Sequence, residues 1–375
     1  MKKLFVYGQS VVGDNFTDRE KETRRLIMNF THGVNTILIS PRRIGKTSLV
    51  KKALSELDDD DILPVFFDMY DCRDDNDFYN KFSAAIFKAT SSSMDTLLKN
   101  ISEFLGRVTP KISVSPDSSS DYSLSLGMTP RQYSSEEILG LPQKIASKRG
   151  KHIVVCIDEF QQIGEWPGSL TVQKTMRGIW QHCQDVTFCF FGSKKHMMER
   201  IFGDKSMPFY QFGEMMELDR IPTAKWVTYI CSKFNAEGKT ISADIAEELC
   251  NRVKNYSSYV QQLSWNLFVL TESEATEENL NEAMSDTLDQ NNSFFTEQIK
   301  DLTSYQLNFL KAIAGGVHKG LTSKRILDEW HLGAKSNISI IKKALTDKEL
   351  IDETDGIVTL SDPVFEIWLK RMSMS

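Results

Sequence analysis

The chain has 375 residues, 41% hydrophobic and 26% charged, which is typical of a soluble globular protein with two or three domains. Its net charge of −6 disfavours a dedicated nucleic-acid binder, since such proteins are usually basic, although a local basic patch is not excluded. The six cysteines form no CxxC pair, and no apolar run is long enough for a signal peptide or membrane span, so we expect a cytoplasmic protein without structural zinc or a membrane partner.

Short apolar runs alternate with helical patterns in the first two-thirds of the chain. Helical stretches follow the first two runs, at residues 46–57 and 77–90. The runs are nearly continuous rather than alternating, as in strands covered on both faces of a parallel sheet. We therefore predict a doubly wound α/β domain. The predicted strands cover residues 36–40, 63–68, 152–157 and 186–191.

Residues 109–133 are rich in Ser, Pro and Asp. They fit a flexible loop, but alternation at residues 111–115 and 122–126 also suggests a two-stranded excursion. Such an insertion would be a lid or contact surface, or simply a surface hairpin, which we favour.

Beyond Pro222 the pattern becomes helical as far as about residue 302, without strand-like runs. Three more helical patterns follow, then a β-like pair with Asp355-Gly356 at its turn, which is a strong hairpin signal. This is the layout of a winged helix-turn-helix. We predict an α/β domain at residues 1–221, a helical lid at 222–300 and a winged helix at 301–375.

The segment TILISPRRIGKTSLV at residues 36–50 carries the phosphate-loop pattern GxxxxGK[ST] between a predicted strand and helix, with Ser40 in place of the first glycine. Backbone N–H groups near Gly45 would bind the β-phosphate, Lys46 would reach the β- and γ-phosphates, and Thr47 would ligate Mg²⁺. The alternative is an ordinary strand–turn–helix with an exposed lysine. The predicted nucleotide-binding residues are Ser40, Pro41, Arg42, Arg43, Ile44, Gly45, Lys46, Thr47 and Ser48. For Arg42 and Arg43 we favour solvated loop charges over extra contacts.

The strand HIVVCI at residues 152–157 ends in two acids, Asp158 and Glu159. With a phosphate loop upstream, Asp158 would hold Mg²⁺ and Glu159 would polarise the attacking water as general base. The alternative is a solvated helix start. Ser193, after the next strand, is a candidate γ-phosphate sensor or a plain loop serine. Arg200 and Arg220 are either arginine fingers or, as we favour, surface residues.

These motifs resemble the archaeal-type ATPases of the STAND/AAA+ group of P-loop ATPases, which end in a winged helix. The resemblance spans essentially the whole chain. Besides the phosphate loop and the acidic strand through Gln161, it rests on NFTDREKE at residues 15–22, similar to the family's F-x-x-R-E-x-E, and on LSDPVFEIW at residues 360–368, similar to L-x-D-P-x-F-x-x-W. It implies ATP as the nucleotide and places Arg19 and Glu20 near the nucleotide or the hinge.

The chain departs from this family at two places. PFYQFGE at residues 208–214 contains no arginine where the family has P-L-Y-G-R, which argues against an arginine-finger mechanism. The family's G-x-P-Y is replaced by NYSSY at residues 255–259, leaving Tyr259 as the residue to pack near the nucleotide. Slow turnover, or a nucleotide-gated switch, fits both departures.

Charge in the predicted winged helix is uneven. Residues 320–345 contain five basic and two acidic side chains, whereas residues 346–375 contain three basic and seven acidic ones. The hairpin that would touch DNA phosphates carries Asp352, Glu353 and Asp355, which duplex DNA repels. DNA is therefore a less favoured partner than another protein or a second copy of this chain.

We expect an ATP-binding, Mg²⁺-dependent ATPase that acts as a nucleotide-gated regulatory switch, with slow or partner-dependent turnover. Lys46, Glu159 and Ser193 are the predicted catalytic residues, and Thr47 and Asp158 the predicted metal ligands. The alternative is a DNA-binding regulator that uses its winged helix and takes ATP as an effector, and a third hypothesis is a nucleotide-locked scaffold without turnover.

Overall fold

The computed structural model describes all residues except 1–3, 12, 107–110, 115–121, 127–132 and 375. It divides into two compact units, which we call the sheet unit (Arg19–Arg42 and Lys46–Leu218) and the helical unit (Met1–Asp18, Arg43–Gly45 and Asp219–Ser375). No helix within the described parts of the chain combines the length and the apolar character that a membrane span needs.

The sheet unit is built on five parallel strands in the order β2-β5-β6-β1-β7. The four predicted strands are all present, so the prediction of a parallel sheet is confirmed. The edge strand β7 was not predicted from the sequence. The strands are β1 (Thr36–Ile39), β2 (Ile62–Asp68), β5 (His152–Asp158), β6 (Val186–Gly192) and β7 (Glu214–Glu217).

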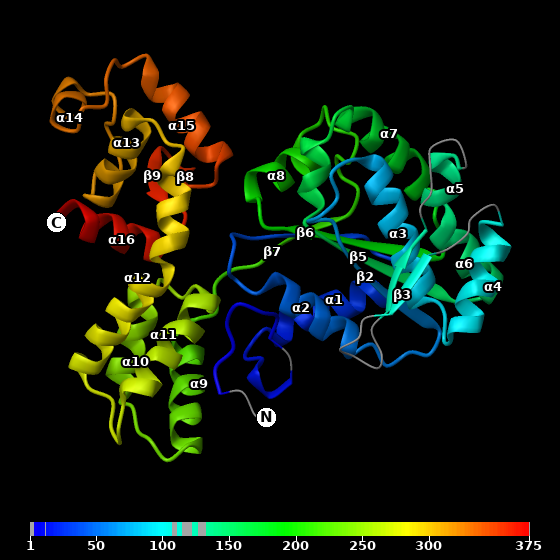
Figure 1. Ribbon diagram of the computed structural model, residues 1–375, viewed down its shortest axis with the longest axis horizontal. Coiled ribbons are helices and arrows are strands. Elements are labelled where there is room, and N and C mark those ends of the chain that lie inside the picture. The colour runs from blue at the N-terminus through cyan, green and yellow to red at the C-terminus, as the bar shows by residue number, and fades with distance from the viewer. Residues whose placement is uncertain (1–3, 12, 107–110, 115–121, 127–132, 375) are drawn as a thin grey trace. The chain divides into compact units, whose positions relative to one another are not determined.

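Helices cover both faces of this sheet (Figure 1). On one face, Phe188 and Phe190 of β6 stack on Trp180, with ring centroids 4.6 Å and 5.8 Å away. Helices α1 and α2 lie on the opposite face (Figure 1). Every residue of β6 is buried, which explains why its sequence runs apolar without alternation.

Helix α1 precedes β1, and the other helices of the sheet unit lie between its strands along the chain. A separate antiparallel hairpin, β3 (Lys111–Val114) with β4 (Tyr122–Ser125), confirms the two-stranded excursion, while most of the remaining predicted loop lies outside the described residues. The helices are α1 (Glu20–Thr31), α2 (Lys46–Ser55), α3 (Asp75–Ala89), α4 (Met94–Phe104), α5 (Ser135–Leu139), α6 (Leu141–Arg149), α7 (Ser169–Trp180), α8 (Lys195–Gly203) and the 3₁₀ helix η2 (Phe160–Glu165).

The helical unit contains a bundle of four lid helices and a winged helix, as predicted. The lid helices are α9 (Thr223–Ala236), α10 (Ala243–Arg252), α11 (Ser257–Leu270) and α12 (Glu277–Lys300). The winged helix comprises α13 (Ser304–Ala314), α14 (Lys324–Glu329), α15 (Asn337–Asp347), the hairpin β8 (Ile351–Thr354) and β9 (Ile357–Leu360), and α16 (Pro363–Met374). Asp355 and Gly356 both have positive φ, 53° and 73°, as the predicted tight turn requires. A further 3₁₀ helix, η1 (Gly13–Asn15), belongs to the N-terminal segment.

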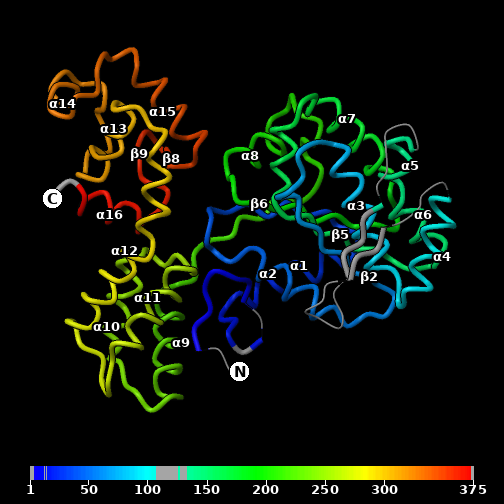
Figure 2. Tube along the Cα trace, viewed as in Figure 1, coloured from blue at the N-terminus to red at the C-terminus, as the bar shows by residue number. Residues whose placement is uncertain are grey.

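The long helix α12 runs from the lid helices to the winged helix (Figure 2). Its Phe295 packs against Phe365 and Trp368 of α16, with ring centroids 5.3 Å and 5.7 Å away. Trp368 also donates a 2.9 Å hydrogen bond from Nε1 to Asn292 Oδ1. These contacts make the aromatic residues of the C-terminal motif a structural core that joins the two parts of the unit.

Candidate functional site

The loop between β1 and α2 has the conformation that a phosphate loop requires at its glycine. Gly45 has a φ of +100°, which a side chain would strain. Helix α2 begins at Lys46, and the first N–H groups of a helix lack intrahelical partners and suit an anion. Ser40, the departure from the glycine pattern, is 2% exposed and fits its place, because its hydroxyl donates a 3.0 Å hydrogen bond to the Pro41 carbonyl.

Lys46 bridges the two ends of this loop. Its Nζ donates to the carbonyls of Ser40 and Pro41, at 3.0 Å and 2.9 Å, and to Ser40 Oγ at 3.2 Å. The side chain is 7% exposed. These neutral oxygens can be exchanged for an anionic partner, because a hydrogen bond between an ammonium and an anion is stronger than one to a neutral oxygen.

Thr47 and Asp158 meet across the sheet unit, as their predicted roles require. Thr47 Oγ1 donates a 2.7 Å hydrogen bond to Asp158 Oδ2. Asp158 is 6% exposed, and this burial raises its pKa to about 6, even though the Thr47 hydrogen bond lowers it. The charges of Glu159 and Asp68 also contribute to this raised pKa. A nearby cation would therefore be favourable here, since it would offset the cost of the buried charge.

Glu159 lies at the turn after β5 with a φ of +53°, a strained conformation for a residue with a side chain. Its Oε2 accepts a 2.9 Å hydrogen bond from Ser193 Oγ and another from Gln161 Nε2. The structure thus brings Ser193 from the end of β6 against the predicted general base. Gly192 explains how Gln161 fits, because a Cβ at Gly192 would lie 1.7 Å from Gln161 Oε1.

The remaining predicted residues fall in different surroundings. Ser48 and Ile44 are buried, and Arg42 is exposed. Arg43 differs from the solvated charge that we favoured, since its guanidinium carbon lies 4.5 Å from the centroid of the Tyr259 ring. Arg19 is buried at the N-terminus of α1, where it pairs with Glu22 at 3.1 Å, and its place near the nucleotide stays a prediction.

Two polar residues beside the acidic pair, Gln161 and Asp68, were not predicted as site residues from the sequence. Gln161 was noted only as part of a family motif, and Asp68 only as the end of a strand. Asp68 is in register with Asp158 on the neighbouring strand, so their carboxylates lie at the same edge of the sheet. The sequence contained a signal for both residues, because polar residues that follow apolar parallel strands gather at one edge of the sheet.

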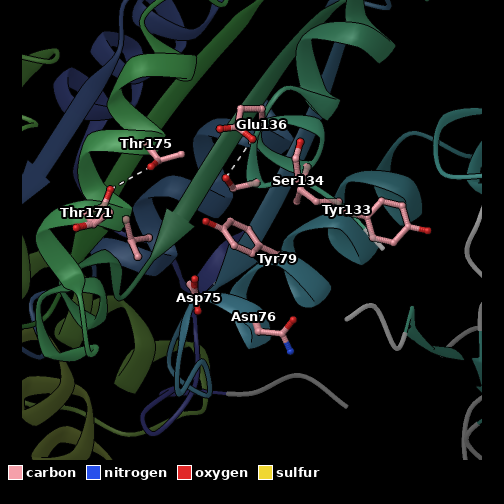
Figure 3. A pocket seen from close by; sticks show the side chains of 11 residues that line it. Asp75, Asn76, Tyr79, Tyr133, Ser134, Glu136, Thr171 and Thr175 are labelled. Carbon is pink, nitrogen blue, oxygen red and sulfur yellow. Dashed lines mark hydrogen bonds between the residues drawn. The ribbon is translucent and has the colours of Figure 1, made fainter. Parts of the chain in front are cut away.

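A separate pocket of about 410 Å³ opens between α3, α5 and α7. Figure 3 shows Tyr79 among its lining side chains, with Asp75 and Glu136 around it. Burial raises the pKa of Tyr79 to about 12, so its hydroxyl stays neutral. Since none of the residues that line the pocket is Lys, Arg or His, it does not suit a nucleotide phosphate.

Comparison with known protein families supports the phosphate-loop interpretation. A family model described as an ATPase domain predominantly from Archaea matches residues 16–212. A second model, described as "Probable winged helix domain", matches residues 293–371. No curated protein sequence matches the chain.

Solved structures share the fold over nearly the whole chain. The Walker-type ATPase PABY2304 of Pyrococcus abyssi is 18% identical, with a TM-score of 0.72 over 98% of this chain and 100% of its own. The ORC2 protein of Aeropyrum pernix, solved as ADPNP–ADP complexes, is 15% identical, with a TM-score of 0.55 over 97% and 98% of the two chains. At these identities the similarity concerns the fold, a P-loop NTPase sheet followed by helical and winged-helix parts.

Proposed function

The chain belongs to the family of ATPase domains found predominantly in Archaea, and from this premise we propose that it is a Mg²⁺-dependent ATPase that acts as a nucleotide-gated regulatory switch. The observation that carries the proposal is the 2.7 Å contact between Thr47 Oγ1 and Asp158 Oδ2, directly beside Glu159. It brings together, near the N-terminus of α2, a hydroxyl, the carboxylate that we propose as metal ligand and the residue that we propose as general base.

The donor set suits Mg²⁺. Hydroxyl and carboxylate oxygens are hard ligands, and Mg²⁺ usually keeps waters and phosphate oxygens at its other positions. Among the described residues no group of three or more His, Cys, Asp or Glu side chains could hold a metal. Thr47 and Asp158 would therefore bind the ion together with the nucleotide. When bound, Mg²⁺ would neutralise charge on the phosphates.

Each residue has one task in this proposal. Lys46 exchanges the Ser40 and Pro41 carbonyls for phosphate oxygens. Glu159 orients the attacking water and accepts its proton. Its hydrogen bonds from Ser193 and Gln161, both to Oε2, fix the orientation of the carboxylate and must be released if it is to turn towards that water. In this proposal the release of Glu159 from these hydrogen bonds is the gated step. A need for this release would explain turnover that is slow or that depends on a partner.

Phosphate release tests the proposal. Wild type and Glu159→Gln are compared with ATP, in Mg²⁺ and in excess chelator, and nucleotide binding is measured in parallel. Turnover that requires Mg²⁺ and disappears in the variant, while binding persists, supports the proposal. Binding without turnover in the wild type favours a nucleotide-locked scaffold, and absence of binding refutes the site.

Duplex DNA is the less favoured partner. On α15, Lys342 forms a 2.7 Å ion pair with Glu353 of the hairpin, so the wing neutralises a base that DNA would need. In favour of DNA stands Arg325, whose side chain is 89% exposed on α14. Salt-dependent DNA binding that weakens in Arg325→Ala and strengthens in Glu353→Gln would support the DNA-binding alternative.

The partner that we favour is a protein or a second copy of this chain, in the cytoplasm. All six cysteines are unpaired, which supports a reducing compartment. Size measurements with ADP and with a non-hydrolysable ATP analogue distinguish self-association from a different partner.

A further inference from the structure

The tip of the phosphate loop is bound by the N-terminus of lid helix α11. The backbone N–H of Ser258 donates a 3.1 Å hydrogen bond to the Arg43 carbonyl. Ser257 Oγ donates a 3.0 Å hydrogen bond to the Ile44 carbonyl. The Ser258 N–H is one of the donors that a helix N-terminus leaves without an intrahelical partner, and the loop supplies its acceptor. The two carbonyls belong to the two residues before Gly45, so the lid helix holds the part of the loop that belongs to the helical unit.

The side chain of Arg43 also contacts residues of the lid helices and of the winged-helix part. Its guanidinium carbon lies 4.5 Å from the Tyr259 ring centroid and 5.2 Å from that of Phe294. Its Nε lies 3.9 Å from Asp362 Oδ2. Cation–π attraction and a facing carboxylate both favour a guanidinium at this place, and 27% of the side chain is exposed.

Asp362 accepts hydrogen bonds with both of its carboxylate oxygens. Oδ2 accepts a 2.5 Å hydrogen bond from the Tyr259 hydroxyl, whose pKa burial raises, so the phenol remains a donor. Oδ1 accepts the backbone N–H groups of Val364 and Phe365, at 2.9 Å and 3.0 Å, which fixes the first turn of α16. The carboxylate therefore ties the start of α16 to the lid and to Arg43.

The backbone of Arg43 shows why this matters for the loop. Its φ is +65°, a left-handed conformation that non-glycine residues adopt only when their surroundings impose it. The contacts that hold Arg43 in this conformation are those with the Ser258 N–H, the Tyr259 ring and Asp362. Without them the loop would relax into other conformations, and fewer molecules would present it ready for phosphate.

We propose that Asp362, through Tyr259 and Arg43, is a positioning residue for nucleotide binding, which makes the winged helix part of the nucleotide switch. This inference rests on the function proposed above. It names the residues through which the winged helix would act on nucleotide binding. Because coupling between two sites is reciprocal, a nucleotide on the loop must stabilise the start of α16 as much as α16 stabilises the binding of nucleotide.

The test measures the affinity of the full chain for a fluorescent ADP with Mg²⁺, in wild type, Asp362→Asn, Arg43→Ala and the double variant. Asparagine caps a helix as well as aspartate does, so Asp362→Asn removes the charge and keeps the cap. We expect each single variant to weaken binding about fivefold, and the double variant no more than either. If Arg43→Ala fails to fold, Arg43→Lys keeps the charge without the planar stacking group.

Glu366→Gln is the matched control. Glu366 lies on α16 four residues after Asp362 and pairs with Lys254 of the lid at 2.7 Å and with Lys370 at 2.9 Å. Its loss loosens the winged helix without touching the loop, so we expect unchanged affinity. A second measurement follows amide exchange at Val364 and Phe365, which ADP should slow in wild type and not in Arg43→Ala.

The outcomes are distinct. Unchanged affinity in Asp362→Asn, additive losses in the double variant, or an equal loss in Glu366→Gln overturns the proposed route. If the wild type itself binds no ADP, the proposed function fails with it. If the wild type binds ADP normally and the variants bind it with the same affinity, only this inference is overturned.

Discussion

Ser193 Oγ lies 2.9 Å from Glu159 Oε2 and donates a hydrogen bond to it. The two residues follow neighbouring parallel strands, β5 and β6, and are 34 positions apart in the chain. A serine at this place can hold the general base or bind the γ-phosphate, but its single hydroxyl proton serves one acceptor at a time. Nucleotide binding and release of Glu159 are therefore linked in the proposed switch.

Glu159→Gln should bind ATP as tightly as wild type and lower turnover about 10²- to 10⁴-fold, because the amide cannot accept the proton of the attacking water. Single-turnover phosphate release measures the loss, and nucleotide titration checks binding. Turnover within a factor of two of wild type would remove Glu159 as the base.

Lys46→Ala should abolish detectable nucleotide binding, because it removes the ammonium that spans the loop and is predicted to reach the β- and γ-phosphates. Lys52→Ala is the control on the same helix, since Lys52 pairs with Glu56 at the surface and should be dispensable. Calorimetric titration with ATP and Mg²⁺ compares the two. Equal behaviour of both variants would contradict the assignment of the phosphate loop.

Gly192→Ala should displace Gln161, because the new Cβ would lie 1.7 Å from Gln161 Oε1. We expect a loss of about 1–3 kcal/mol in unfolding free energy, as in other overpacked cores. Basal turnover should rise, because Glu159 loses the Gln161 hydrogen bond.

The double variant Gly192→Ala/Gln161→Ala separates these two effects. Removing the Gln161 side chain should restore most of the stability while turnover stays raised. Chemical denaturation and phosphate release provide both values. A double variant that remains as unstable as Gly192→Ala would show that the clash lies elsewhere.

Stability should depend on Asp158 in an identifiable pH window. Burial raises its pKa from 3.8 to about 6, so between these values the native protein holds a proton that the unfolded chain has released. The unfolding free energy should therefore fall as the pH rises from about 4 to 6. Asp158→Asn removes this cost and should be more stable than wild type at pH 8 by up to about 3 kcal/mol.

Thermal unfolding of both proteins in chelator, from pH 4 to 8, measures this difference. Binding of nucleotide with Mg²⁺ should change in the opposite sense and weaken below about pH 6 in wild type, because a protonated carboxyl cannot hold the ion. Parallel stability curves for wild type and Asp158→Asn would contradict the raised pKa.

Much of the fold could be predicted from the sequence because its signals are local. Strand β6 is buried along its length and therefore apolar at nearly every position, whereas β7 was missed because Glu214–Glu217 is short and half polar. A side chain from α1 also stabilises this edge strand, since Glu214 accepts two hydrogen bonds from Arg25, at 3.0 Å and 2.8 Å. Long-range contacts of this kind leave no periodic pattern.

The sequence by itself determined the phosphate loop, the acidic strand end and the turn at Asp355-Gly356, since each depends on the spacing of neighbouring residues. Tertiary structure alone decided that Gln161 holds Glu159 and that Arg43 faces Tyr259 and Asp362. A side chain's preference for a helix, strand or turn is encoded within a few residues. Its partner from a distant segment is set by strand order and by packing, which only the folded chain brings together.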